Sequence, residues 1–137
     1  MTVKKVLILS LIGLLIVTVT MAGIFFFILN KNNNKEKKVE HFHYELGELY
    51  TNIKDSSRIL KINITIEYTN KKLQEVLEAH RAKITNDILE LLRNKTYKEL
   101  IGQPGQQKAR MDILSLVKKD INSEEISNIY FVEFIIQ

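Results

Sequence analysis

The strongest constraint on this 137-residue chain is an apolar run close to its amino terminus. Residues 6–29, VLILSLIGLLIVTVTMAGIFFFIL, contain no charged side chain. A helix of this length, at a rise of ~1.5 Å per residue, crosses the ~30 Å hydrocarbon core of a membrane. The run is therefore predicted to be a transmembrane helix that anchors the chain.

Two other interpretations of the run fit the sequence less well. A cleavable signal peptide also places basic residues such as Lys4 and Lys5 before an apolar stretch. Its apolar stretch, however, spans only about 7–15 residues and ends at a small-residue cleavage site, which is missing here. A buried helix of a soluble domain needs a polar side, and this run has none. An uncleaved anchor remains the preferred interpretation.

The net charge of +4 arises beside the apolar run and not in the rest of the chain. Six lysines face two glutamates there, which gives 6 − 2 = +4; the residues are Lys4, Lys5, Lys31, Lys35, Lys37 and Lys38 against Glu36 and Glu40. Lysines next to a membrane span interact with anionic headgroups. A nucleic-acid-binding protein carries its basic patch on the folded domain. The charge therefore indicates a membrane partner and no nucleic acid.

The orientation of the anchor stays open at this point. Two lysines precede the span and four closely follow it, so the usual bias of basic loops toward the cytoplasm would place the following residues inside the cell. Long domains can nevertheless cross the membrane regardless of nearby charge. The absence of cysteine suits an exported domain, but it suits a cytoplasmic domain as well.

The remaining sequence divides into a linker and one folded domain. Residues 1–5 form a short amino terminus, residues 30–41 are a polar linker rich in asparagine and lysine, and residues 42–137 are the domain. Alternating apolar positions predict strands over residues 42–51 and 58–68. Turn-forming residues at Lys54–Ser57 join them, which indicates an antiparallel hairpin.

The second half of the domain is predicted to be mostly helical. Apolar residues at helical spacing predict one long helix over residues 70–92, a short helical turn at 96–101 and another helix over 106–121. The breaker GQPG at residues 102–105 separates the last two. With a closing strand at 129–137, the fold class is α+β: a small antiparallel or mixed sheet covered by helices.

The closing strand, IYFVEFIIQ, is apolar on both of its faces. Strict alternation places Ile129, Phe131, Glu133 and Ile135 on one face and the intervening residues on the other. Such a strand is expected inside the sheet, with a neighbour on each side. Glu133 would then be a buried acid that needs a partner, and Arg58 and Arg81 are the candidates.

Few residues suggest chemistry. His41 and His43 have a spacing that can bind metal, but no cysteine and no cluster of carboxylates lies near them in the sequence, so no metal site is expected. His80 falls on the apolar side of its helix and is expected at the core or its boundary. GQPGQQK lacks the pattern of a phosphate-binding loop. With no catalytic cluster visible, the chain is expected to be neither an enzyme nor a cofactor-binding protein.

With these elements placed, the chain resembles the FliL family of flagellar basal body-associated membrane proteins. The resemblance combines the basic amino terminus, single span and polar linker with three segments: YELGELYTNIKDSSRILKINITIEY, RAKITNDILELLRNKTYKELIG and IYFVEFIIQ. It implies a bacterial inner-membrane protein with a periplasmic or extracytoplasmic domain whose fold is related to the stomatin-like domains. It also implies a homo-oligomeric ring around the flagellar stator, contact with the MotB-type subunit, and a role in torque and in swimming and swarming motility.

Two interpretations of function stay open. One is this flagellar accessory role, and the other is a membrane-anchored stomatin-like scaffold that acts on a different membrane complex. In either case the expected partner contacts are Phe42, Tyr44 and Leu46, because apolar residues just after the linker could be free of the core.

Overall fold

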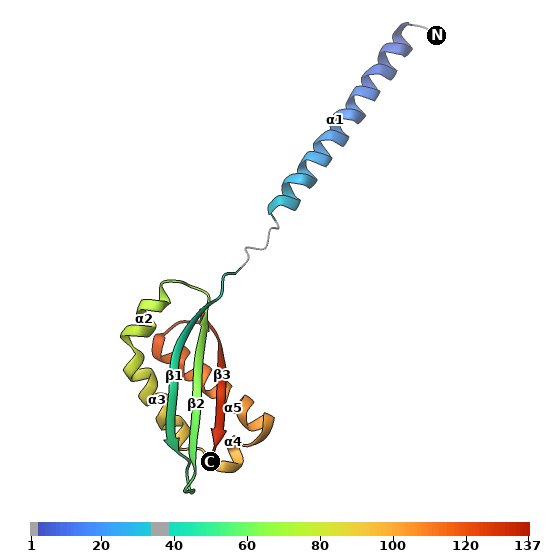
Figure 1. Ribbon diagram of the computed structural model, residues 1–137. Coiled ribbons are helices and arrows are strands. Elements are labelled where there is room, and N and C mark those ends of the chain that lie inside the picture. Colours follow the sequence, from blue (N-terminus) through green and yellow to red (C-terminus); the bar gives the residue numbers. More distant parts are fainter. Residues whose placement is uncertain (1–2, 34–38) are drawn as a thin grey trace. The chain divides into compact units, whose positions relative to one another are not determined.

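The computed structural model describes residues 3–33 and 39–137, which belong to two separate compact units divided after Lys38 (Figure 1). The described part of the first unit is the helix α1, Val3–Asn33. Its segment Val3–Ile28 is long and apolar enough to span a membrane. The hydroxyls of Thr18 and Thr20 donate to carbonyl oxygens of the preceding turn, at 2.9 Å for Thr18 and Leu15, so these polar groups are satisfied within the helix.

The helix is longer than the apolar run, so the predicted linker is partly wrong. Residues 30–33, assigned to the linker from their polarity, continue α1. Polar residues at a helix end extend the hydrogen-bonded backbone without needing an apolar environment. Residues 34–38 of the predicted linker lie outside the described residues.

The second unit contains a three-stranded sheet. Its strands are β1, Phe42–Asn52, β2, Ile59–Tyr68, and β3, Ile126–Ile136. The order is β1-β2-β3 and both pairs are antiparallel. The hairpin predicted from the alternating sequence is confirmed, and β2 is the central strand. The sheet and the helices that cover it are the predicted α+β arrangement.

The prediction that the closing strand lies inside the sheet is wrong, because β3 is an edge strand. Asn63 pairs with Glu133 while the next residue, Ile64, pairs with Phe131, so Val132 is an extra residue in a β-bulge. The bulge reverses the alternation, and both Phe131 and Phe134 pack against the core. The apolar residues at both odd and even positions of β3 are thus explained by the bulge. They do not indicate that β3 has a neighbouring strand on each side.

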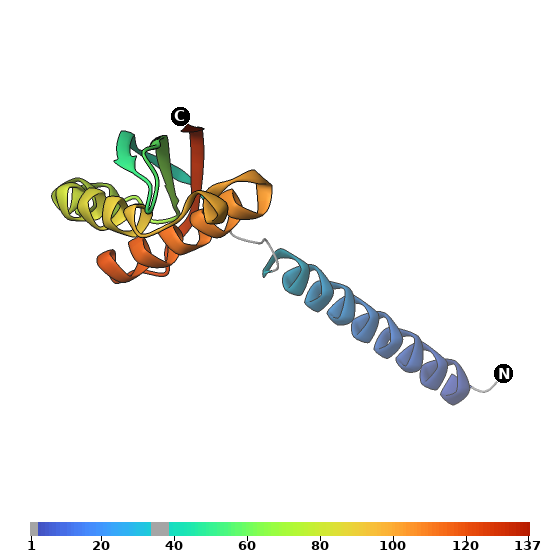
Figure 2. The ribbon, with the colours of Figure 1, turned by 90° about the horizontal axis from the view of Figure 1, so that it is seen from below.

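The helices cover one face of the sheet (Figure 2). They are α2, Leu73–Ala79, α3, Arg81–Arg93, α4, Tyr97–Leu100, and α5, Gly102–Ile121. The predicted long helix is therefore two helices, which meet at His80. The expectation that His80 lies at the core or its boundary is also wrong: the residue is exposed, and its Nδ1 lies 2.9 Å from the carbonyl oxygen of Val76.

The GQPG segment is the first turn of α5 and not a break between helices. Proline is tolerated there because the first N–H groups of a helix have no acceptor within the helix. Gly105 packs against the preceding segment so closely that an added Cβ would lie 2.7 Å from the carbonyl oxygen of Glu99. The glycine that suggested a breaker instead allows α5 to approach α4.

The core lies between the sheet and the helices. Alternate residues of β2 point into it, and Leu60, Ile62, Ile64 and Ile66 are fully buried. Helices α3 and α5 contribute side chains at helical spacing: Ile84, Ile88, Leu92, Ala109, Ile113 and Val117. Within the second unit, no helix covers the opposite face of the sheet, which is the remaining candidate for contact with other molecules (Figure 2).

Candidate interaction face

The side of the sheet that points away from the helices is called the open face below. Because side chains alternate along a strand, the buried positions of β2 leave Lys61, Asn63, Thr65 and Glu67 on this side. The strand register adds four residues from each neighbour: His43, Glu45, Glu48 and Tyr50 from β1, and Asn128, Tyr130, Glu133 and Ile135 from β3.

The open face is acidic. It carries the four carboxylates of Glu45, Glu48, Glu67 and Glu133 but only the one lysine, Lys61. Acids and bases are nearly balanced over the domain, so this excess is a local property of one face. A surface with such a charge attracts basic partners and repels anionic membrane headgroups.

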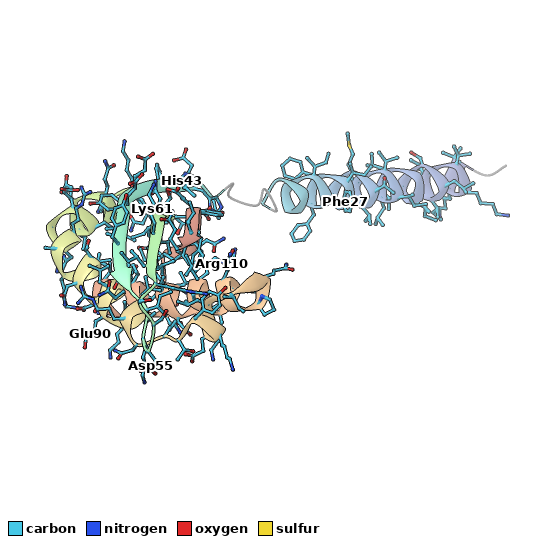
Figure 3. The ribbon with its side chains drawn as sticks, turned by 60° about the horizontal axis from the view of Figure 1, so that its bottom comes forward. Phe27, His43, Asp55, Lys61, Glu90 and Arg110 are labelled. Carbon is cyan, nitrogen blue, oxygen red and sulfur yellow. The ribbon has the colours of Figure 1, made fainter. Side chains whose placement is uncertain are left out.

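Lys61, on the central strand, links the three strands on this face (Figure 3). Its Nζ lies 2.7 Å from Oε2 of Glu133 and 3.4 Å from Oε1 of Glu48. The hydrogen bond with Glu133 raises the pKa of Lys61. The phenol of Tyr50 donates to Glu48 at 2.9 Å, and this bond lowers the pKa of Glu48.

The predicted partners of Glu133 are therefore incorrect. Glu133 pairs with Lys61 on the open face, and its side chain is 30% exposed. Arg58 lies with its guanidinium over the ring of Tyr97, 3.8 Å from the centroid. Arg81 donates from Nη2 to the carbonyl oxygen of Leu46 at 3.0 Å. Because Val132 is an extra residue in the strand, the Glu133 side chain lies on the open face and not on the core side of the sheet.

Glu67 forms a second cluster, at the end of the open face where the chain enters β1. Its Oε1 accepts from Ser127 at 2.6 Å and lies 2.8 Å from Nδ1 of His41. Its Oε2 accepts from Tyr130 at 2.6 Å and lies 3.6 Å from Nε2 of His43. One carboxylate thus joins β2, β3 and the residues that precede and begin β1.

The environment of Glu67 favours its ionised form. Although the side chain is largely buried, hydrogen bonds from Ser127 and then Tyr130 stabilise the negative charge. Together with the bond to His41 they lower the pKa of Glu67 to about 2. The hydrogen bond between Tyr130 and Glu67 also raises the pKa of the Tyr130 phenol, because the phenol donates this bond to a carboxylate. Glu67 is therefore a negatively charged residue whose side chain is held in place by hydrogen bonds on the open face.

Comparison with known proteins places the chain in a family. Residues 43–137 match the model of the family described as flagellar basal body-associated protein FliL. The chain belongs to the FliL family. This is a family of flagellar accessory proteins and not of enzymes, which confirms the non-enzymatic interpretation of the sequence.

A curated relative gives the same result over part of the chain. The flagellar protein FliL of Aquifex aeolicus (strain VF5) is 27% identical over 77 residues, which cover 56% of this chain and 48% of that relative. The chain thus spans about half the length of the curated relative it matches. The matched family segment begins at His43, so the acidic open face lies within the FliL domain.

The histidine pair of this FliL domain lies around Glu67, a carboxylate distant in sequence. Over residues 3–33 and 39–137 no group of three His, Cys, Asp or Glu side chains suits a metal ion. Both oxygens of Glu67 already accept hydroxyl hydrogen bonds from Ser127 and Tyr130. His41 lies at hydrogen-bonding distance from the carboxylate, and His43 lies 3.6 Å from it.

The residues expected to contact partners occupy a different environment from the one predicted. Tyr44 and Leu46 are buried in the core, so the premise that they are free of it is wrong. Phe42 is half-buried and stacks on Tyr68 with 5.6 Å between ring centroids. The Tyr44 phenol donates to Glu78 at 2.6 Å, and burial raises the pKa of Tyr44.

The residues of the open face were missed, although a signal for them was present. The alternation in RILKINITIEY already separated Lys61, Asn63, Thr65 and Glu67 from the buried isoleucines. What the alternation could not show was which neighbouring strands would bring Glu48, Glu133 and Tyr130 beside them.

Proposed function

We propose that this protein is a membrane-anchored accessory of the flagellar motor that associates with the stator and supports torque generation, swimming and swarming. The observation that carries the proposal is a FliL domain over residues 43–137 that follows a helix able to span a membrane. The acidic, hydrogen-bonded open face supports a role in binding proteins, because a surface of one charge attracts partners of the opposite charge.

The domain is proposed to lie outside the cytoplasm, in the periplasm where the cell has one. The natural chain contains no cysteine, so a single engineered cysteine reports its own location. Asp55→Cys places a thiol at the exposed tip of the β1–β2 hairpin (Figure 3), and Lys4→Cys places one at the start of α1. A membrane-impermeant maleimide is expected to label only the Asp55→Cys chain in intact cells.

Permeabilised cells provide the control, since both single-cysteine chains should then react. Labelling of the Lys4→Cys chain alone in intact cells would mean that the domain is cytoplasmic. That result would remove every extracytoplasmic partner from consideration.

The proposed assembly is a ring of identical chains around the stator, with a stomatin-like domain arrangement and contact with a MotB-type subunit. Each chain in such a ring meets its neighbours through two different surfaces, because a head-to-tail contact closes by rotation. Chemical crosslinking of the full chain in native membranes tests this part. A ladder of homo-oligomers together with an adduct to the stator subunit is expected, and monomers alone with stators present would contradict the assembly.

The second candidate is a membrane-anchored scaffold for another membrane complex. The same anchor and domain would serve a scaffold. The match to the FliL relative covers only 48% of that protein. Crosslinking separates the two, because the scaffold role predicts adducts that contain no stator subunit.

A further inference from the structure

The edge strand β3 presents backbone groups that nothing in the described chain pairs. Ile59 and Gln137 exchange two backbone hydrogen bonds, at 2.9 Å and 3.0 Å. In an antiparallel pair, hydrogen-bonded and non-hydrogen-bonded residue pairs alternate. Ile136 and Phe134, opposite Leu60 and Ile62, therefore direct their N–H and C=O groups away from β2. These groups form a free edge along the end of β3.

The other edge of the sheet is less accessible. Helices α2 and α3 lie on the β1 side (Figure 1). Arg81 donates to the carbonyl oxygen of Leu46 at 3.0 Å, and Arg93 donates from Nε to Oγ1 of Thr51 at 3.2 Å. Arg81 thus occupies a backbone acceptor of β1, and Arg93 covers the side chain of Thr51 on the same strand. Of the two edges, β3 offers the freer backbone.

Apolar side chains are exposed along β3. Val132, the bulged residue, is 68% exposed, and Ile135 on the open face is 37% exposed. Unpaired edges with exposed apolar residues favour association with another strand, and proteins usually protect them with charge or cover. The exposed residues therefore indicate that a partner covers this edge.

A notch of about 290 Å³ borders the same edge, between the first half of α5 and β3. Its lining is mostly polar side chains: Gln103, Gln106, Gln107, Arg110, Tyr130 and Phe131. The Nε of Arg110 (Figure 3) is buried and has no hydrogen-bond acceptor. Buried donors normally have a partner, so an oxygen atom from an added segment would complete the site.

Charge selects the kind of segment. Glu133 faces outward beside the free edge, and β1 carries Glu45 and Glu48 on the same face. A second copy of this chain that added its own β1 or β3 would place acids next to Glu133. Like charges on neighbouring strands destabilise the pairing, whereas opposite charges contribute roughly 0.2–1 kcal/mol. A basic strand from a different protein fits better than a second copy.

We propose that the free edge of β3 binds an extended, lysine- or arginine-bearing segment of another protein by strand addition. The segment hydrogen-bonds to the outward backbone groups of Phe134 and Ile136, places basic side chains beside Glu133, and covers Val132. The proposal rests on the edge, the notch and the acidic face, so it stands whether or not the partner belongs to the flagellar motor.

The test uses the full chain in uncharged detergent micelles and two fluorescein-labelled nine-residue peptides, one alternating lysine with valine and one alternating glutamate with valine. Fluorescence anisotropy measures affinity, and NMR hydrogen exchange measures protection of individual amides. The lysine peptide is expected to bind at least tenfold more tightly than the glutamate peptide and to slow exchange at Phe134 and Ile136.

Three variants make the test specific to the edge. Val132→Lys places a charge at an exposed position and is expected to weaken lysine-peptide binding at least fivefold while leaving the circular dichroism spectrum unchanged. Glu133→Gln should weaken it about threefold. Glu124→Gln is the matched control, since its side chain is 90% exposed and lies outside the sheet, and it should leave the affinity unchanged.

Three results would overturn the proposal. The first is equal affinity for both peptides, and the second is binding without protection of Phe134 and Ile136. The third is protection of these amides that rises with protein concentration in the absence of peptide, because a second copy would then cover the edge.

Discussion

At the residue scale, Glu67 connects the start of the FliL domain to its sheet. Its carboxylate accepts hydrogen bonds from Ser127 and Tyr130 and contacts His41, which directly precedes β1. Because these partners come from distant parts of the sequence, the bonds form only in the folded domain. Glu67 is therefore a structural acid whose ionisation is coupled to folding.

The Glu67→Gln variant tests this coupling. The pKa of Glu67 falls from 4.5 to about 2 on folding, so the stabilisation is complete above pH 4.5 and is lost as the pH falls toward 2. At neutral pH the variant should lose about 1–3 kcal/mol of stability. Between pH 4.5 and 2 the difference from the natural chain should shrink. Calorimetric melting over this range measures both effects, and a constant difference would show that Glu67 is not the coupled group.

Gly105 is a second residue with a specific requirement. An alanine Cβ there would lie 2.7 Å from backbone atoms of Glu99 and Leu100, which cannot move without shifting α4. Gly105→Ala is therefore expected to lower the free energy of unfolding by about 1–3 kcal/mol, despite the higher helix propensity of alanine. Gln106→Ala, at the exposed neighbouring position, is the control and should be neutral or slightly stabilising. A more stable Gly105→Ala chain would contradict the close contact.

Some of these residue roles could be predicted and others could not. The period of two in β2 predicted which apolar side chains are buried. It could do so because the extra residues of the bulges lie in the neighbouring strands and not in β2. The partner of Glu133 could not be predicted, since a single extra residue at Val132 changes the face on which Glu133 lies. Bulges are not visible in a pattern of apolar residues alone.

At the element scale, the type of each segment was predicted better than its boundaries or neighbours. Both strands of the hairpin and the helical character of residues 73–93 and 106–121 were predicted from periodicity. The break at His80 and the helical GQPG turn were not, because the apolar spacing continues through His80 and glycine with proline also occurs in loops. The edge position of β3 depends on the order of strands, which local patterns do not determine.

The closing strand β3 is expected to be essential for stability although it lies at the edge. Phe134 and Ile136 pack against the core, and Gln137 pairs with Ile59. Removing residues 134–137 should cost about 3 kcal/mol or more from lost apolar burial, which corresponds to a fall of roughly 12 °C or more in melting temperature. Calorimetry of the detergent-solubilised full chain measures it. Unchanged melting after this truncation would show that the end of β3 contributes nothing to the domain.

At the scale of the whole molecule, the chain combines a span-length helix with a FliL domain of helices on one sheet face and an acidic second face. The apolar run and the α+β class were evident from the sequence because both depend on long patterns. The acidic face was not, since it collects single residues from three strands. The proposed stator role uses these parts together: the anchor localises the domain, and the open face and free edge bind proteins.

The central claim is that the protein supports the flagellar motor, and swimming speed in a strain that lacks the gene tests it most directly. Flagellar filaments are counted by electron microscopy in the same cells, and the full chain is supplied from a plasmid as the control. We expect filaments to be retained, swimming speed and swarm expansion to fall, and the plasmid to restore both. Normal speed in cells that lack the protein would contradict the account.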